Sequence, residues 1–251
     1  MSLSKNKIKY IQSLKEKKFR IKHKNFIAEG EKLVLDLLET CKCKFIFALP
    51  SFLSIHTEIT ADEIIEVSEK ELKKITSLKT APDIIAIFYK PEYNLNEIDL
   101  ENNLSLVLDG VQDPGNVGTI IRIADWFGIK YVFCNENTAD AFNPKTVQAT
   151  MGAIARVKVI YTDINELLLK YKHLPAFGTF LDGNNIYKEQ LSKNGFIVMG
   201  SEGKGINPDV ENLITNRIYI PSYPNSNNTS ESLNVAVAAA ITCSEFRRRS
   251  N

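Results

Sequence analysis

The stretch LDGVQDPGNVGTIIR, residues 108–122, contains polar groups placed where a strand would pass into a helix. A turn with two glycines at such a junction can bind a phosphate, contact a cofactor or simply change the chain direction. Asn116 is a favourable N-cap residue, and one apolar stripe follows it on the expected helix: Val117, Ile120, Ile121, Ala124 and Gly128. Arg122 points roughly away from that stripe and is therefore free for solvent or a ligand.

The spacing of these glycines excludes two common phosphate sites. Gly115 and Gly118 do not form the dinucleotide fingerprint, and no Gly-Lys-Ser/Thr follows them, which excludes a nucleotide-triphosphate loop. By itself the pattern favours a structural turn.

A second loop, MGSEGKGINPDV at 199–210, directly follows an apolar run. Gly200, Gly203 and Gly205 allow backbone to approach a ligand and permit positive φ. Among them lies Glu202, whose carboxylate suits a hydroxyl group or a positive centre. An exposed turn with solvated charges is an equal alternative.

A third segment, IPSYPNSNNTSESLNVAVAAAI at 220–241, passes from a polar loop into a helix of small apolar residues. Such a helix packs closely, so we expect it to be buried or to lie at a subunit interface. Ser232 and Asn234 then sit at the entrance to a buried helix and need hydrogen-bond partners. Ser232 also suits a plain N-cap.

The elements around these loops predict an α/β fold. From residue 104 onward, near-continuous apolar strands alternate with helical stretches, which is typical of a parallel sheet covered on both faces. In such sheets ligands bind beyond the carboxyl ends of the strands, and all three loops follow strands. We predict a small α/β domain at 1–92, a polar linker at 93–103 and the larger domain at 104–251.

Charge is unevenly distributed although the net charge is only +1. Residues 1–24 carry one acid, Glu16, and nine bases: Lys5, Lys7, Lys9, Lys15, Lys17, Lys18, Arg20, Lys22 and Lys24. Such a basic arm favours nucleic acid as partner, with a solvated helix as the alternative. Four scattered cysteines predict neither a disulfide scaffold nor a metal site. No signal peptide or membrane span is evident, so we expect a cytoplasmic protein.

Taken together, the three segments resemble the SpoU/TrmH family of RNA ribose 2′-O-methyltransferases, of the SPOUT class. The stretch FNPKTVQATMGAIARV at 142–157 is also similar to the family, and the resemblance covers about residues 104–248. KHKNFIAEGEKLVLDLL at the N-terminal end is similar, more loosely, to the ribosomal-protein-like RNA-binding domain that precedes many of these enzymes. This resemblance implies a parallel-sheet SPOUT domain with a C-terminal trefoil knot, preceded by a small α/β substrate-binding domain.

The resemblance also implies a cofactor and a site. S-adenosylmethionine would lie in the knot, held by backbone groups of Gly200, Ile220 and Leu233. Arg122 would be the main catalytic residue, with Asn116, Glu202, Ser232 and Asn234 around it and no metal. The active site would form across a homodimer. Ten residues, 222–231, separate Pro221 from Ser232, more than is typical of the family, and their Asn and Ser side chains can satisfy a longer turn.

Chemistry limits the role of Arg122. Its pKa, above about 12 in a free side chain, makes it a poor general base. A planar guanidinium is well suited to bind the phosphate beside the target ribose, and transient acceptance of the proton stays open.

Other functions fit the same residues. The separate N-terminal domain favours ribosomal RNA over tRNA as the substrate, and an antibiotic-resistance methylase would have similar architecture. A non-catalytic RNA-binding or ribosome-assembly factor is the alternative from another class; it would not need to bind S-adenosylmethionine.

Overall fold

The computed structural model describes residues 3–223 and 232–248, and its chain separates into two compact units. Unit 1 comprises Met1–Glu92 and Asp140–Arg156; unit 2 comprises Tyr93–Ala139 and Val157–Asn251. Most of the ten-residue loop at 222–231 lies outside the described residues. In the described part of the chain, the helices are all too short or too polar to cross a membrane.

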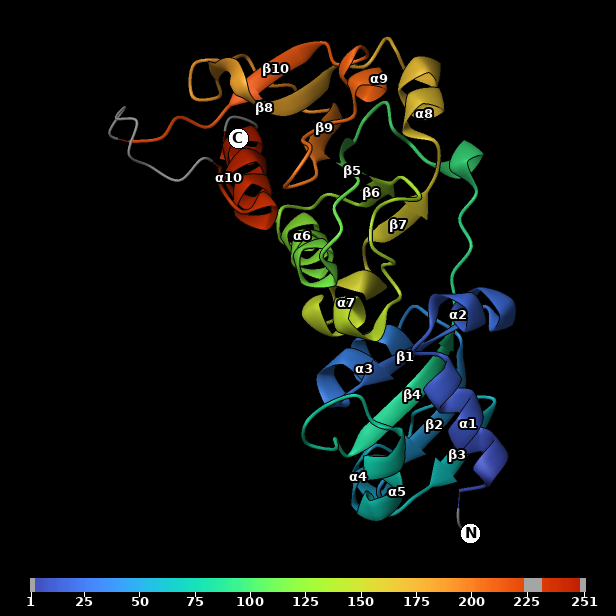
Figure 1. Cartoon of the computed structure of the whole chain (residues 1–251). Helices are drawn as coiled ribbons and strands as arrows, with labels where there is room; N and C mark the ends of the chain where they lie inside the picture. Colours follow the sequence, from blue (N-terminus) through green and yellow to red (C-terminus); the bar gives the residue numbers. More distant parts are fainter. Residues whose placement is uncertain (1–2, 224–231, 249–251) are drawn as a thin grey trace. The chain divides into compact units, whose positions relative to one another are not determined.

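Unit 1 is a four-stranded sheet with helices packed against it (Figure 1). Its strands are β1 (Asn25–Glu29), β2 (Cys43–Ala48), β3 (Glu63–Glu66) and β4 (Ile84–Tyr89), in the order β1-β4-β2-β3. β4 is antiparallel to both neighbours, whereas β2 and β3 are parallel. The helices are α1 (Lys5–Ser13), α2 (Lys17–His23), α3 (Glu31–Leu38), α4 (Pro50–Ile55), α5 (Glu69–Ile75) and α7 (Pro144–Ala149), followed by the 3₁₀ turn η2 (Ala153–Ala155).

Residues 3–24 are part of this unit rather than an appended arm. In α1, Ile11 is fully buried, and Leu14 just after it is buried as well. Arg20 of α2 is also buried and forms an ion pair with Asp140 at 2.8 Å. The expectation of a basic arm is therefore wrong for Arg20, because its guanidinium is buried and paired with a carboxylate inside unit 1.

Residues 140–156 pack with unit 1, although the sequence pattern runs on into the larger domain. Phe142 lies with its ring centroid 4.9 Å from that of Phe26 on β1. Gly152, with φ of 95°, lies so close to Asp36 that a Cβ there would approach the carboxylate to 1.9 Å. The positive φ favours glycine at this position, and the Asp36 side chain would have to move to admit a Cβ.

Unit 2 contains a six-stranded parallel sheet in the order β10-β8-β9-β5-β6-β7. Its strands are β5 (Leu104–Asp109), β6 (Tyr131–Cys134), β7 (Lys158–Tyr161), β8 (Ala176–Asn185), β9 (Gly195–Gly200) and β10 (Asn216–Tyr219). Its helices are η1 (Leu95–Glu97, a 3₁₀ turn), α6 (Pro114–Trp126), α8 (Ile164–Lys170), α9 (Pro208–Glu211) and α10 (Val235–Arg248). The predicted parallel-sheet α/β class is confirmed.

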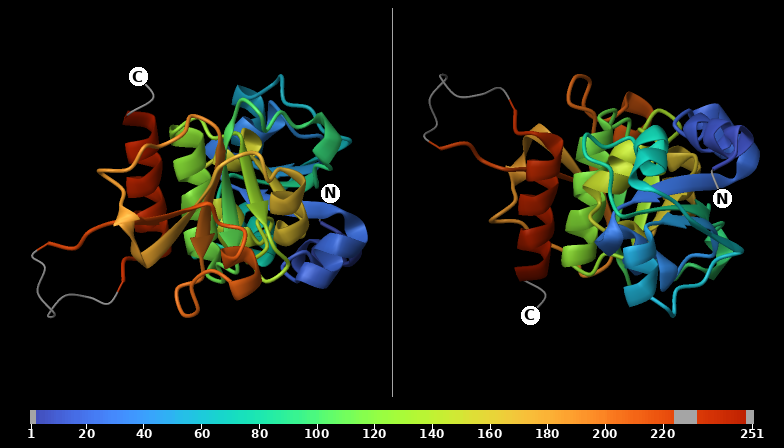
Figure 2. Two further views of the ribbon diagram at one scale, coloured as in Figure 1. Left: turned by 90° about the horizontal axis from the view of Figure 1, so that it is seen from above. Right: turned by 90° about the horizontal axis from the view of Figure 1, so that it is seen from below.

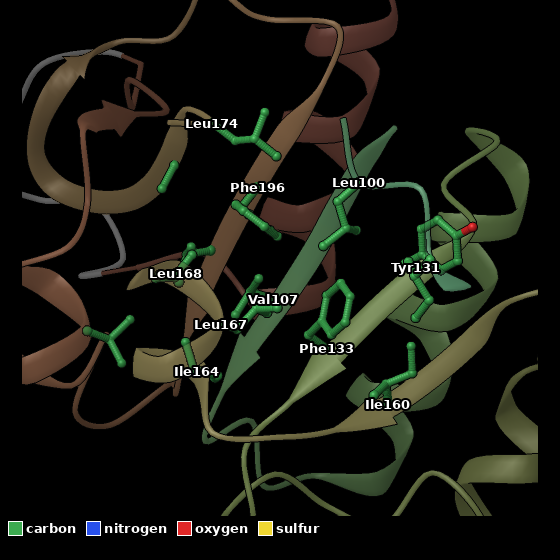
Figure 3. Packing of buried hydrophobic residues seen from close by; sticks show 14 of the residues in the cluster. Leu100, Val107, Tyr131, Phe133, Ile160, Ile164, Leu167, Leu168, Leu174 and Phe196 are labelled. Atoms are coloured by element: carbon green, nitrogen blue, oxygen red, sulfur yellow. The ribbon is translucent and has the colours of Figure 1, made fainter. Parts of the chain in front are cut away.

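Helices cover both faces of this sheet, as near-continuous apolar strands require. On one face α6 and α10 lie side by side (Figures 1 and 2). On the other, Val107 and Phe133 pack in a buried cluster with Ile164 and Leu167 of α8 (Figure 3). The expected linker contributes Leu100 to the same cluster, so residues 93–103 pack onto unit 2.

Candidate active site

Asn116 connects the three loops. Its Nδ2 donates to Oε1 of Glu202 at 2.5 Å, and its Oδ1 accepts from Nδ2 of Asn234 at 3.1 Å. The three residues follow β5, β9 and β10, whose carboxyl ends point the same way because the strands are parallel. Glu202 and Asn234 lie 86 and 118 residues after Asn116 in the sequence, and they meet it at the carboxyl ends of the parallel strands.

The start of α6 explains why Asn116 is available for these contacts. The N-cap is Asp113, whose carboxylate accepts from the Asn116 backbone N–H at 2.9 Å, and Pro114 opens the helix. The interpretation of Asn116 as the N-cap is therefore wrong by three positions. Because Asp113 caps the helix, the Asn116 amide is left for the neighbouring loops.

Glu202 lies on a short loop that closes on itself. Ser201 and Gly205 exchange two backbone hydrogen bonds, at 3.0 and 2.9 Å, and Gly205 has φ of 69°. At Gly200, a Cβ would come within 2.2 Å of the Gly205 carbonyl carbon, so this close approach of the backbone requires glycine there. This tight closure holds the Glu202 side chain out toward Asn116.

Asn234 caps the last helix. Its Oδ1 accepts from the backbone N–H groups of Ala236 and Val237, at 3.0 and 3.3 Å, while its Nδ2 reaches Asn116. The capping function considered for Ser232 therefore belongs to Asn234. Ser232 is exposed, two residues before the cap.

Arg122 is exposed on α6, and the buried stripe beside it is formed by Val117, Ile120, Ile121 and Ala124. Within residues 3–223 and 232–248, the Arg122 guanidinium makes no hydrogen bond or ion pair. It lies six residues, or about 9 Å of helix, beyond Asn116. The described chain thus offers a free cation near a hydrogen-bonded polar cluster but does not join the two.

The residues expected to hold the cofactor all belong to unit 2. Gly200 ends β9, Ile220 is half-buried just after β10, and Leu233 is 49% exposed just before Asn234. Gly203 and Gly205 face open space, since a Cβ at either would meet no heavy atom within 4 Å. The backbone of the loop that carries Gly203 and Gly205 is therefore accessible to a ligand. Leu233, on the segment before α10, offers an exposed apolar side chain.

One buried group at this edge was not identified from the sequence. Asp109, the last residue of β5, is 4% exposed and accepts hydrogen bonds from Asn135 and from the backbone of Asn207. Burial raises the pKa of its carboxyl, and the hydrogen bond from Asn207 opposes that rise. A charged residue at the end of an otherwise apolar strand is the signal that could have indicated it.

Comparison with known proteins identifies the family. The model of the SpoU rRNA methylase family matches residues 103–244, more than half of the chain. The chain belongs to this family. The described elements β5 through α10 carry the match, and an MRM3-like substrate binding domain matches residues 5–86.

Relatives of this SpoU methylase cover its full length. It is 32% identical to the 23S rRNA (guanosine(2553)-2′-O)-methyltransferase RlmP of Bacillus subtilis, over 96% of this chain and 95% of the relative. An RNA methyltransferase of the TrmH family from Porphyromonas gingivalis is 41% identical, with a TM-score of 0.90 over 99% and 100% of the two chains. The AdoMet-bound rRNA methyltransferase of Sinorhizobium meliloti is 29% identical, with a TM-score of 0.88 over 99% and 97%.

The protein is thus a methyltransferase, and S-adenosylmethionine is its methyl donor. The residues at the sheet edge fit that group. Exposed backbone at Gly203 and Gly205 offers hydrogen-bonding groups without side-chain obstruction, and Leu233 offers apolar surface for a purine. Within the described residues, His, Cys, Asp and Glu form no cluster of three or more suited to a metal ion.

The link from Asn116 predicts a specific loss of activity. Asn116→Asp keeps the acceptor for Asn234 but turns a carboxylate oxygen toward Glu202. Because like charges repel, we expect kcat/KM to fall about 10- to 100-fold.

The matched control is Asn102→Asp. Asn102 also donates its amide to a carboxylate, that of Asp99 at 3.2 Å, but on an exposed turn before β5. This variant should keep wild-type kcat/KM. Equal activity of the two variants in a methyl-transfer assay would contradict the role of Asn116.

Proposed function

We propose that this SpoU methylase methylates a ribose 2′-oxygen of ribosomal RNA. The observation that carries the proposal is the Asn116 link, which joins loops after three parallel strands through Glu202 and Asn234. Full-length similarity to an enzyme named as a 23S rRNA 2′-O-methyltransferase supports the substrate class.

S-adenosylmethionine supplies an activated methyl group on its sulfonium. The protein then has to align the ribose hydroxyl for in-line attack and favour loss of its proton. The exposed guanidinium of Arg122 binds the phosphate beside the target ribose through its planar fork. The Glu202 carboxylate accepts a hydrogen bond from a ribose hydroxyl. Asn116 holds that carboxylate in place, and Asn234 in turn holds the Asn116 amide.

Backbone groups of Gly200, Ile220 and Leu233 hold the cofactor, and Ser232 helps to tie the loop before α10. We propose that the segment carrying these residues forms the family's C-terminal trefoil knot. Part of that segment, 224–231, lies outside the described residues.

We further propose that the active site forms in a homodimer. Trp126 on α6 is 85% exposed, and Val237 on α10 also exposes much of its side chain. A groove of about 400 Å³ beside α10 is lined by Phe127, Tyr187, Ala240, Ile241, Ser244 and Glu245. Exposed apolar surface of this kind is typical of a protein interface. A second subunit would bring a partner loop to Arg122.

The class of RNA substrate is tested by measuring methyl transfer to each RNA directly. The purified protein is incubated with methyl-labelled S-adenosylmethionine and either ribosomal RNA or tRNA from cells lacking the enzyme. We expect label in ribosomal RNA. Label in tRNA alone would overturn the substrate class, and failure to bind S-adenosylmethionine by calorimetry would favour an assembly factor. The cytoplasmic location remains part of the proposal and is tested by cell fractionation.

The basic residues of α1 and α2 predict a salt effect. Lys9, Lys17 and Lys22 are exposed and, among the described residues, make no ion pair. Each phosphate contact contributes about 0.7 to 0.9 to the salt slope of log K. If all three lysines contact phosphates, their joint replacement by glutamine should flatten the slope by about 2 to 3 and leave cofactor affinity unchanged.

Three exposed lysines of unit 2 provide the control. Lys130, Lys172 and Lys193 precede the strands β6, β8 and β9, at the sheet edge opposite the candidate site. Their replacement by glutamine should leave the salt slope as it is. Equal slopes for the two triple variants would argue against RNA binding by α1 and α2.

A further inference from the structure

Asp109 lies at the centre of the sheet edge that carries the cofactor loop. It ends β5, where it pairs in register with Gly200, the last residue of β9. Its side chain is buried and contacts no loop residue named so far as catalytic. A buried carboxylate is costly to desolvate, so a residue that only filled space here would be apolar.

Two donors hold this carboxylate. The Asn135 Nδ2 donates to Oδ1 at 2.6 Å, and the Asn207 backbone N–H donates to Oδ2 at 2.6 Å. Neither donor is a cation, so an ion pair does not explain the burial. Burial also raises the pKa of this carboxyl.

The orientation of Asn135 is fixed by its other contacts. Its Oδ1 accepts from the backbone N–H groups of Gly110 and Thr138, both at 3.0 Å. The amide nitrogen must therefore face Asp109. Both neighbours of the Asp109 side chain are donors. A carboxyl group has an acceptor oxygen for each of them, whereas an amide would place a donor against a donor.

Asn207 lies at the far end of the loop that carries Glu202. This loop leaves β9 at Gly200, is closed by the antiparallel Ser201–Gly205 pair, and ends at Asn207, which caps α9. The Asp109 carboxylate thus holds the end of the loop, at Asn207, to β5. β5 is also the strand that pairs with Gly200, where the loop begins.

We propose that Asp109 is a positioning residue that closes the Gly200–Asn207 loop into the shape that binds S-adenosylmethionine. This inference rests on the proposed function, because it assigns the cofactor to that loop. Asp109 acts through the backbone of the loop, by accepting the Asn207 N–H, and does not contact the reacting atoms.

The test exchanges the side chains of Asp109 and Asn135. Asp109→Asn turns an amide donor toward the Asn135 amide or toward the Asn207 N–H, leaving one buried donor unpaired. We expect the Kd for S-adenosylmethionine, measured by calorimetry on the full chain, to rise about tenfold or more. KM for the cofactor should rise in parallel, with kcat at saturation within about threefold of wild type.

The double variant Asp109→Asn with Asn135→Asp restores the pattern with donor and acceptor exchanged. The new amide at 109 donates to the new carboxylate at 135, and its carbonyl accepts the Asn207 N–H. The carboxylate at 135 still accepts from Gly110 and Thr138. We expect cofactor Kd within about threefold of wild type. Loss of affinity in the double variant equal to that in Asp109→Asn would overturn the proposal, as would wild-type affinity in Asp109→Asn.

Hydrogen exchange separates this inference from the proposed function. In the cofactor-free protein, the Asn207 amide should exchange faster in Asp109→Asn and return to wild-type protection in the double variant. This readout needs no ligand, so it stands even if wild-type protein fails to bind S-adenosylmethionine, a result that would count against the proposed function. Unchanged Asn207 exchange in Asp109→Asn would overturn the fastening role of Asp109.

Discussion

Arg122→Lys should lower kcat for methyl transfer at least about 100-fold, the scale of loss when a group acting in the transition state is misplaced. Lysine keeps the positive charge but lacks the planar fork that binds a phosphate through two parallel hydrogen bonds. Arg122 is exposed and makes no described contact, so α6 should fold normally in the variant.

Binding measurements separate catalysis from affinity. Arg122→Lys should leave the Kd for S-adenosylmethionine unchanged and the Kd for RNA within about threefold, because lysine retains the charge that attracts phosphate. A variant that turned over at nearly the wild-type rate, with RNA binding unchanged, would remove Arg122 from its proposed role.

The second large effect concerns stability. Arg20→Met should lower the free energy of unfolding of unit 1 by about 3 to 5 kcal/mol, because it leaves the largely buried carboxylate of Asp140 without its cation. The guanidinium also donates to the carbonyl oxygens of Leu14 and Lys15, each at 2.8 Å, so the turn between α1 and α2 loses its cross-link. Hydrogen-exchange protection of the β1 amides reports on this unit.

An exposed ion pair nearby provides the control. Lys18 pairs with Glu16 at 3.0 Å, and both side chains are largely solvated. Lys18→Met should change protection of the β1 amides by less than about 1 kcal/mol. Similar losses from Arg20→Met and Lys18→Met would show that burial of the Arg20 pair does not matter.

Local patterns predicted most strands and helices of unit 2. Apolar runs such as LSLVLD and YVFC became β5 and β6, because a strand covered on both faces needs apolar residues on both. In unit 1, α4 was not predicted, since a six-residue helix presents too little periodicity to recognise.

Contacts between residues far apart in the chain could not be predicted from the sequence. Arg20 and Asp140 are 120 residues apart, and nothing local in the basic segment distinguishes the buried guanidinium from its exposed neighbours. The burial of Ile98 and Leu100 was likewise not predicted. They are two apolar residues in a polar stretch expected to be a linker, and they pack onto the sheet.

For the site, the sequence predicted residue types better than contacts. Asn116, Glu202 and Asn234 were selected by motif, and their hydrogen bonds follow from the sheet order, which no single motif contains. Asp109 was missed because its function depends on Asn135 and Asn207, from two other loops.

The most direct measurement identifies the methylated atom. Ribosomal RNA from cells lacking the enzyme is treated with the purified protein and S-adenosylmethionine, digested to nucleosides, and analysed by mass spectrometry with mapping of the modified position. The account predicts a single 2′-O-methylated nucleotide, absent when the Arg122→Lys variant is used over the same time. A methyl group on a base, or no ribose methylation by the wild-type protein, would contradict it.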